Sequence, residues 1–420
     1  MQRLKLFFGS ILLILILFTF SAASTNVERD ETPKVDIQNS LAIQKRAKMY
    51  SSRKRALELA INTYFEEAIK SGDIVGAGVS IVKADSILMS DGFGQRNFLE
   101  KAKPNGETVF RLGSLSKGFT GVLAAKLVEE GAFKFNDKLS DYLPQFHFGD
   151  SLNTSKVKIS NILSHTSGTP YHSYTNLVEA NVSMEKIAEQ FKEVTPISEP
   201  GKQYSYQNAM FALSQEVMLK ATGKDINTLL MDRFFMPLGM SNISMDHESF
   251  SRKENIAKPH AKRGKGWRVL PLKGNYYNAV AAGGIDASPT DMAKWMRFLL
   301  GHNPSVMSKR NLDTAFNPFI DLNENNKYYQ RWEGHVKSSY AFGWRIHTMK
   351  NKITDKEETI WHHGGSVNSY RNEIALFPES DLGICVLMSN NSRLARTVVP
   401  DLREIVKQVY ELTPEALASL

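Results

Sequence analysis

Residues 110–131 read FRLGSLSKGFTGVLAAKLVEEG, an apolar helical pattern that begins with a serine and a lysine. Ser114 and Lys117 are three positions apart, so in a helix the amine lies beside the hydroxyl. Burial and the positive end of the helix dipole disfavour the ammonium form of Lys117, which can then help to deprotonate Ser114. The stretch therefore predicts a paired nucleophile and base at the start of a helix.

The spacing alone does not select this pair, because the chain contains five Ser-x-x-Lys matches. The context selects it, since Ser114 begins an apolar helix and follows a strand-like stretch that ends at Gly113. The other matches are Ser51/Lys54, Ser80/Lys83, Ser155/Lys158 and Ser183/Lys186. We interpret those four as chance occurrences of a short motif.

Strand-like runs lie on both sides of this helix in the sequence. Upstream, residues 76–84 (GAGVSIVKA) and 86–94 (SILMSDGFG) read as two strands joined by a short polar turn. Further strands are expected near residues 339–348, 357–362, 370–378 and 382–389, and helices at 55–70, 289–300 and about 401–411. Short strands joined by brief turns indicate an antiparallel sheet that terminal helices can cover.

The pattern predicts an α+β fold, an antiparallel β-sheet flanked by helices together with a mostly helical second region. The sheet region is expected at residues 55–113 and 270–420, and the helical region at 114–269. In the sheet region, Ser288-Pro289-Thr290-Asp291 reads as a helix N-cap with a capping acid. Gly283 and Gly284 read as backbone requirements.

Composition narrows the classes of function. The chain has 420 residues, of which 42% are hydrophobic and 23% charged, enough apolar content for a large core. Its net charge of +8 is spread out apart from basic runs at 45–55 and 252–268, which we interpret as solvated surface. No nucleic-acid motif accompanies either run, so we expect no nucleic-acid partner. The single cysteine, Cys385, excludes an intrachain disulfide framework and a multi-cysteine metal site. No metal or other cofactor is expected.

The N-terminus has the pattern of an export signal. Basic Arg3 and Lys5 precede an apolar stretch at 6–20 and then small residues that suit a signal-peptidase site. We expect a signal peptide at 1–23, a linker at 24–54 and a folded domain at 55–420, in a secreted or periplasmic protein. Because the apolar stretch is short for a membrane span, the pattern favours secretion over an uncleaved anchor. The anchor is the alternative, and it would be the protein's only membrane attachment.

Five sequence blocks carry a resemblance to a known family. They are FRLGSLSK at 110–117, LSHTSG at 163–168, PGKQYSYQN at 200–208, AAGGIDASPTDMAKW at 281–295 and HHGGSVNSYRNEIALFP at 362–378. In this order they resemble the serine beta-lactamase and penicillin-binding protein superfamily. The resemblance is closer to the class C beta-lactamase-like branch, which also includes DD-peptidases and carboxylesterases.

The resemblance implies roles for particular residues. Ser114 matches the acylated nucleophile and Lys117 its helix partner. Tyr206 matches the phenol that serves as general base and leaving-group acid, and Asn208 the amide that orients substrate and lysine. A tyrosine could act as a base only if nearby cations stabilise its phenolate, for which Lys117 is the obvious candidate. His165, in the LSHTSG block, is expected to shape a loop.

A strand element of the family departs from the usual pattern here. His363-Gly364-Gly365 stands where true class C beta-lactamases have Lys-Thr-Gly, and by position the backbone N–H groups of Ser114 and Ser366 form an oxyanion hole. The change weakens recognition of a carboxylate, so we expect His363 to bind one only when protonated. His362 could supply the cation if the register differs by one residue.

The resemblance implies a secreted serine hydrolase that acts through an acyl-enzyme on D-amino-acid peptides, amides or esters. The expected partner is a small-molecule or peptidoglycan-peptide substrate. One alternative is a class C-like beta-lactamase that hydrolyses beta-lactams weakly. Another is a non-catalytic protein that binds peptidoglycan or beta-lactams, although the intact Ser, Lys, Tyr and Asn argue against a relic site.

Overall fold

The computed structural model describes residues 37–264, 266–323, 326–351 and 354–418. The predicted signal peptide, residues 1–23, and residues 24–36 of the predicted linker lie outside these ranges. The chain divides into a unit at 1–48, of which 37–48 are described and helical, and a unit at 49–420. The elements described below belong to the second unit, apart from the first residues of α1.

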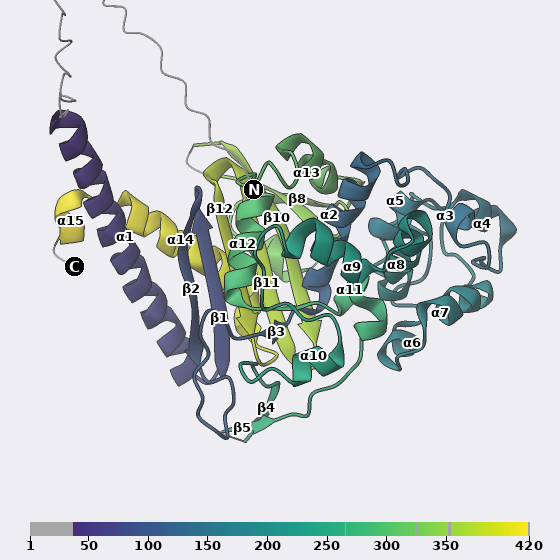
Figure 1. The fold of residues 1–420 in the computed structure, drawn as a ribbon, viewed down its shortest axis with the longest axis horizontal. Helices are drawn as coiled ribbons and strands as arrows, with labels where there is room; N and C mark the ends of the chain where they lie inside the picture. The colour runs from purple at the N-terminus through teal and green to yellow at the C-terminus, as the bar shows by residue number, and fades with distance from the viewer. Residues whose placement is uncertain (1–36, 265, 324–325, 352–353, 419–420) are drawn as a thin grey trace, which may run out of the picture. The chain divides into compact units, whose positions relative to one another are not determined.

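Eight antiparallel strands form one sheet, as the sequence pattern predicts (Figure 1). Their order is β2-β1-β12-β11-β10-β9-β8-β7. The bounds are β1 (Gly76–Lys83), β2 (Ser86–Gly94), β7 (Ile320–Asp321), β8 (His335–Tyr340), β9 (Arg345–Lys350), β10 (Glu357–Val367), β11 (Tyr370–Phe377) and β12 (Leu382–Met388). Because β1 pairs with β12, the first hairpin completes a sheet that is otherwise built from the last hundred residues.

The single strand predicted near 339–348 is wrong, because the chain reverses there. β8 ends at Tyr340 and β9 begins at Arg345, with a tight turn between them. The Ala341 N–H donates to the Trp344 carbonyl, and Gly343 has φ +77°, a value that favours glycine. The turn residues 341–344 (AFGW) are mostly apolar, so polar turn residues do not mark the turn in the sequence.

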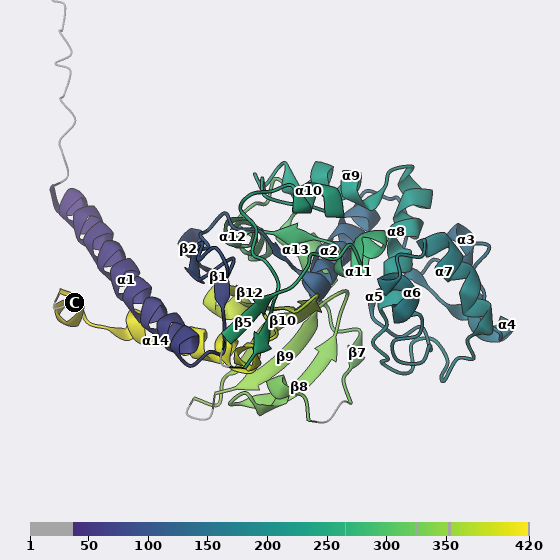
Figure 2. The ribbon, with the colours of Figure 1, turned by 90° about the horizontal axis from the view of Figure 1, so that it is seen from below.

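Helices cover both faces of the sheet (Figure 2). Alternate residues of β12 show the division: Ile384 and Val386 pack with one apolar cluster, and Cys385 and Leu387 pack with another. The first cluster includes residues of α1 (Ile37–Lys70) and α14 (Val398–Glu411). The second includes residues of α2 (Ser116–Glu129) and α12 (Pro289–Leu299). Ser288 caps α12 through the predicted capping box with Asp291.

Residues 37–54 are helical, whereas the sequence pattern predicted a linker there. Residues 37–70 contain neither glycine nor proline and are rich in residues with high helix propensity. The charged segment lacks a continuous apolar face, which is why periodicity did not reveal it.

The remaining helices lie mostly between β2 and β7 in the sequence. They are α3 (Leu139–Tyr142), α4 (Ser151–Lys156), α5 (Ile159–Leu163), α6 (Thr175–Glu179), α7 (Met184–Gln190), α8 (Asn208–Thr222), α9 (Ile226–Leu230), α10 (His247–Ser251), α11 (Val280–Gly283), α13 (Lys309–Phe316) and α15 (Pro414–Ala418). Two small sheets pair β3 (Phe110–Arg111) with β6 (Asp286–Ala287) and β4 (His260–Arg263) with β5 (Gly266–Val269). In the described part of the chain, no helix combines the length and apolarity that a membrane span requires.

Candidate active site

Ser114 lies on a short 3-10 turn, η1 (Gly113–Leu115), that leads from β3 into α2. The turn contacts β10 so closely that a Cβ at Gly113 would come within 3.0 Å of the Ser366 backbone, and Gly113 also has φ +56°. On β10, a Cβ at Gly365 would come within 2.2 Å of the Leu112 carbonyl oxygen. Two glycines therefore allow the serine turn and the strand to touch.

Lys117 is fully buried, one helical turn after Ser114. Its Nζ lies 3.3 Å from Ser114 Oγ, 2.8 Å from Asn208 Oδ1 and 2.7 Å from the Ala282 carbonyl oxygen. Burial holds the pKa of Lys117 well below its usual value, and repulsion from Arg345 lowers it further. Both effects favour the neutral amine over the ammonium, which is the direction that the sequence pattern predicts.

The phenol of Tyr206 reaches the same hydroxyl from the loop before α8. Its OH lies 2.9 Å from Ser114 Oγ. Burial raises the pKa of Tyr206 to about 12, although the hydrogen bond to Ser114 and the charge of Arg345 act in the opposite direction. The resting site therefore holds a protonated phenol, whereas a base role at this stage requires the phenolate. A neutral Lys117 supplies no cation to stabilise that phenolate.

Asn208, the first residue of α8, holds the lysine from the helical region. Its Oδ1 accepts from Lys117, and its Nδ2 donates to the Tyr276 hydroxyl at 3.2 Å. The backbone there is fixed by His165, whose Nδ1 accepts the Gln207 N–H at 3.1 Å and whose ring centroid lies 4.3 Å from that of Tyr206. The loop-shaping role expected of His165 thus has a specific geometry.

His363 lies at the cleft but is not placed to act as a cation. It is 1% exposed, and its Nδ1 lies 2.8 Å from the Gly364 carbonyl oxygen, which can only accept. Nδ1 therefore carries the proton, and Nε2 accepts from the Tyr340 hydroxyl at 3.0 Å. Burial and the charge of Arg345 hold the pKa of His363 well below its usual value. The structure does not support the protonated His363 that the sequence hypothesis required.

The alternative cation, His362, points away from the cleft lining. It is fully buried, with its two ring nitrogens 3.0 Å from His347 Nε2 and 2.8 Å from Glu373 Oε2. Burial and the nearby Arg345 hold the pKa of His362 well below its usual value. A one-residue shift in register therefore does not supply the missing positive charge either.

Arg345, a residue that the sequence analysis missed, brings a permanent cation to the cleft. Its guanidinium carbon lies 6.0 Å from the centre of the Tyr206 ring and 5.8 Å from that of Tyr340. The buried Nε has no hydrogen-bond partner, and among the described residues Arg345 forms no ion pair. Arg371, a second cation at the cleft, is paired with Glu373 at 2.7 Å. The sequence signal that could have identified Arg345 is an arginine at the first position of a strand that follows a turn with glycine.

These groups surround a pocket of about 390 Å³. The pocket is lined from the helical region, the serine turn and the sheet by Ser114, Tyr171, His172, Thr175, Glu179, Tyr204, Tyr206, Asn208, Tyr276, Lys327, Arg345, His363, Gly364, Ser366 and Arg371. Within the described ranges, no cluster of three or more His, Cys, Asp or Glu residues is arranged to hold a metal ion.

Ser114, Lys117 and Tyr206 lie within the part of the chain that matches a protein-family model. The family model described as Beta-lactamase matches residues 61–407. The chain belongs to this family. The family comprises serine hydrolases of the beta-lactamase fold, as the five sequence blocks indicated.

Curated relatives in the beta-lactamase family are distant in sequence. Protein flp of Staphylococcus aureus (strain NCTC 8325 / PS 47) is 24% identical over 345 residues, which are 81% of this chain and 65% of that protein. Unguisins hydrolase ungD' of Aspergillus campestris (strain IBT 28561) is 26% identical over 307 residues, 68% of this chain and 53% of that protein. The chain thus spans about two thirds of the length of protein flp.

Solved structures share the beta-lactamase fold. The octameric penicillin-binding protein homologue from Pyrococcus abyssi superposes with a TM-score of 0.68 at 22% identity, covering 81% of this chain and 76% of that one. EstCE1, described as a hydrolase with promiscuous acyltransferase activity, gives a TM-score of 0.70 at 16% identity, covering 84% and 99%. At these identities the likeness concerns the fold alone.

Proposed function

We propose that this chain hydrolyses amides or esters through an acyl-enzyme at Ser114. The observation that carries the proposal is the position of Ser114 Oγ, 2.9 Å from the Tyr206 hydroxyl and 3.3 Å from Lys117 Nζ. The neutral amine of Lys117 has two N–H groups and one lone pair. Asn208 Oδ1 and the Ala282 carbonyl accept the two N–H groups, so the lone pair is left for the Ser114 proton.

In acylation, Ser114 Oγ attacks the substrate carbonyl carbon and its proton passes to Lys117. The backbone N–H groups of Ser114 and Ser366, brought together by the contact at Gly113, stabilise the oxyanion. Tyr206, protonated in the resting site, gives its proton to the leaving group as the carbonyl–heteroatom bond breaks. This leaves an acyl-serine, a Lys117 ammonium and a Tyr206 phenolate.

In deacylation the same groups reverse their roles. The Tyr206 phenolate, now beside a charged Lys117, takes a proton from water, and the resulting hydroxide attacks the acyl carbon. Ser114 Oγ leaves and recovers its proton from Lys117. Tyr206 is therefore the acid of the first step and the base of the second, and the proton count of the site is restored.

The positive groups of the cleft favour a substrate with an acidic group. Arg345 on β9, without an ion-pair partner among the described residues, and Arg371 on β11, two strands away, can bind a carboxylate through charge-assisted hydrogen bonds. We therefore propose D-amino-acid peptides or related amides and esters, small or derived from peptidoglycan, with Arg345 in the role expected of His363. Weak class C-like hydrolysis of beta-lactams, which also carry a carboxylate, is the second candidate. The export signal expected at residues 1–23 suits such a substrate outside the cytoplasm.

Covalent labelling tests the proposal. A fluorophosphonate and, separately, a fluorescent penicillin should each add one adduct to the intact mass, and Ser114→Ala should abolish both. Ser155→Ala, at another Ser-x-x-Lys match, is the matched control and should label normally. Slow loss of the penicillin adduct would identify a beta-lactam-inhibited peptidase, and fast loss a beta-lactamase. Labelling that persists in Ser114→Ala would overturn the assignment.

A further inference from the structure

A row of hydrogen-bonded side chains runs through the sheet beside the cleft, and catalysis as proposed above does not use it. This histidine row consists of His335, Ser338, His347, His362 and Glu373. Its four links join His335 Nε2 to Ser338 Oγ at 2.8 Å, Ser338 Oγ to His347 Nδ1 at 2.7 Å, His347 Nε2 to His362 Nδ1 at 3.0 Å and His362 Nε2 to Glu373 Oε2 at 2.8 Å. Each link is short enough for proton transfer.

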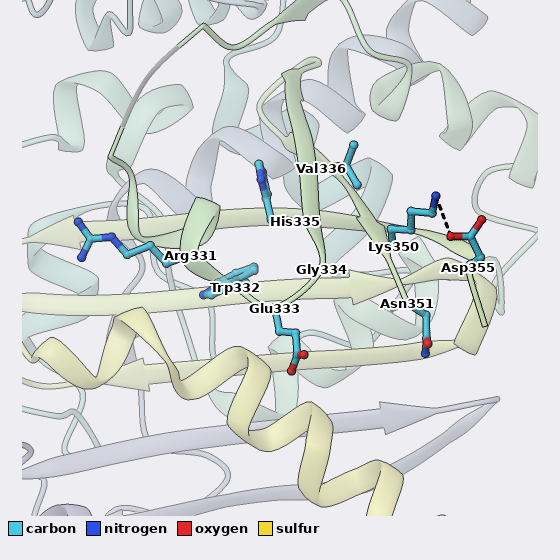
Figure 3. Close-up of a pocket in the computed structure, with 9 residues that line it drawn as sticks. All are labelled: Arg331, Trp332, Glu333, Gly334, His335, Val336, Lys350, Asn351 and Asp355. Atoms are coloured by element: carbon cyan, nitrogen blue, oxygen red, sulfur yellow. Dashed lines mark ion pairs between the residues drawn. The ribbon is translucent and has the colours of Figure 1, made fainter. Parts of the chain in front are cut away.

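The row connects two different surfaces of the protein. At one end His335, which is partly exposed, lines an open pocket on the β8–β9 hairpin (Figure 3). At the other end Glu373 is fully buried, and its Oε1 accepts from Arg371 Nη2 at 2.7 Å. Arg371 lines the catalytic pocket. The row therefore joins solvent at the hairpin to a cation of the cleft.

The chemistry of Glu373 sets the direction of every hydrogen bond in the row. An ionised carboxylate can only accept, so His362 donates through Nε2 and must accept at Nδ1. His347 then donates through Nε2 and accepts at Nδ1 from the Ser338 hydroxyl, which in turn accepts from His335 Nε2. All three imidazoles are neutral in this arrangement, each link has one donor and one acceptor, and His335 Nδ1 is left as an acceptor at the outer end.

Adding one proton at the outer end reverses the direction of every hydrogen bond in the row without leaving a charge on the histidines. A proton that binds His335 Nδ1 lets the Nε2 proton move to Ser338, the Ser338 proton to His347 Nδ1, and the His347 Nε2 proton to His362 Nδ1. The His362 Nε2 proton then moves to Glu373. The histidines are neutral again, and the product is a neutral carboxyl group beside Arg371.

We propose that the histidine row is a proton wire from solvent at His335 to Glu373, and that protonation of Glu373 frees the Arg371 charge to bind an acidic group of the substrate. The wire stands on the geometry of the row alone. Its consequence for substrate binding rests on the function proposed above.

The groups around Glu373 make it the resting place of the proton. Burial raises the pKa of Glu373 to about 7, against the opposing charge of Arg371. Burial also holds the pKa values of His347 and His362 well below the usual range. The titratable or charged groups that face Glu373 come from each neighbouring element: Arg371 on β11, Tyr328 on η5 (Tyr328–Arg331), His362 on β10, Arg345 on β9 and Cys385 on β12.

The sign of the effect follows from that pKa. Above about pH 7 Glu373 is ionised and its charge is paired with Arg371, so Arg371 attracts a substrate carboxylate weakly. Below it Glu373 is neutral and Arg371 carries an uncompensated positive charge. Affinity for carboxylate-bearing substrates should rise as pH falls through this range, and affinity for neutral esters should not.

An infrared pH titration tests the inner end of the wire without using catalysis. The infrared band of the protonated Glu373 carboxyl group should grow as pH falls through about 7 in the wild type. It should be absent in Glu373→Gln. In the same variant, KM for a carboxylate-bearing substrate at pH 8 should fall about tenfold, since one hydrogen bond to a charged group is gained, and lose its pH dependence. A carboxyl band that titrates unchanged in Glu373→Gln would overturn the assignment.

Replacing Ser338, the smallest side chain in the row, tests the proton path itself. After flash release of protons from a caged acid, Ser338→Ala should slow the growth of the carboxyl band at least about tenfold, because a proton must then cross the buried sheet without a partner. Ser339→Ala is the matched control: Ser339 is adjacent, equally buried and bonded to Asp321 instead. Equal rates in both variants would overturn the wire. Failure of Ser114 labelling would remove the proposed hydrolase but leave these infrared results unchanged.

Discussion

Lys117 Nζ lies 2.8 Å from Asn208 Oδ1, although the two residues are 91 positions apart in the chain. The contact joins the first turn of α2 to the first turn of α8, and it holds the amine in a site where burial favours the neutral form. A neutral amide suits a neutral amine, because a carboxylate in the same place would stabilise the ammonium. The charge state of the proposed base therefore depends on the residue type at position 208.

Asn208→Asp should raise the pKa of Lys117 and so leave it charged at neutral pH. We expect acylation at pH 7 to fall about a hundredfold, as for loss of a general base, and to recover as pH rises. The wild type should show no such dependence above neutral pH. Acylation rates for a neutral p-nitrophenyl ester across pH measure this, with Asn176→Asp on the exposed side of α6 as a control for added charge. Identical profiles would show that Lys117 is not the base.

Tyr206→Phe should separate substrates by their leaving group. The phenol is expected to protonate a poor leaving group such as an amine, whereas p-nitrophenolate leaves without a proton. Acylation by an amide should therefore fall about a hundredfold or more, and acylation by the activated ester far less. Deacylation should slow for both, because the acyl-enzyme is the same kind of intermediate. Equal losses in acylation for both substrates would contradict the acid role.

Arg345→Met should weaken turnover of carboxylate-bearing substrates selectively. Loss of a hydrogen bond between charged groups predicts a decrease in kcat/KM of about 10- to 100-fold, with partial recovery in Arg345→Lys. The neutral p-nitrophenyl ester should change little at high pH. Near neutral pH its acylation should fall somewhat, because the pKa of Lys117 rises when the repelling charge is removed.

Two control variants sharpen that comparison. Arg331→Met removes an exposed arginine on η5 and should leave both substrates unaffected. His363→Gln should not reproduce the selectivity, because His363 is neutral in the folded site. A carboxylate preference that follows His363 and ignores Arg345 would restore the hypothesis drawn from the sequence.

His165→Leu should damage both the fold and the site. It removes the acceptor of the Gln207 N–H and leaves a buried donor unpaired, which costs about 1 to 3 kcal/mol of unfolding free energy. His165→Asn keeps a side-chain acceptor at the same place and should recover part of the stability. Chemical denaturation and kcat measured together check this, since Tyr206 precedes Gln207. Full stability in His165→Leu would show that the hydrogen bond is dispensable.

Local patterns in the sequence determined the sheet, the first hairpin and the pairing of Ser114 with Lys117. These depend on a period of two in a strand and on a spacing of three in a helix, both of which hold before the chain is folded. The capping box at Ser288 belongs to the same class, because its partners lie within one turn. The five sequence blocks, in their order, indicated the family, and the resemblance to that family identified Tyr206 and Asn208.

Only the tertiary structure decided which groups carry charge. His363 becomes neutral because folding removes water from it and places Arg345 nearby, and Arg345 itself reaches the cleft only because β8 and β9 form a hairpin beside β10. The raised pKa of Tyr206 and the row that ends at Glu373 have the same origin. Desolvation and Coulomb interactions depend on neighbours that are distant in the chain, so no local pattern contains them.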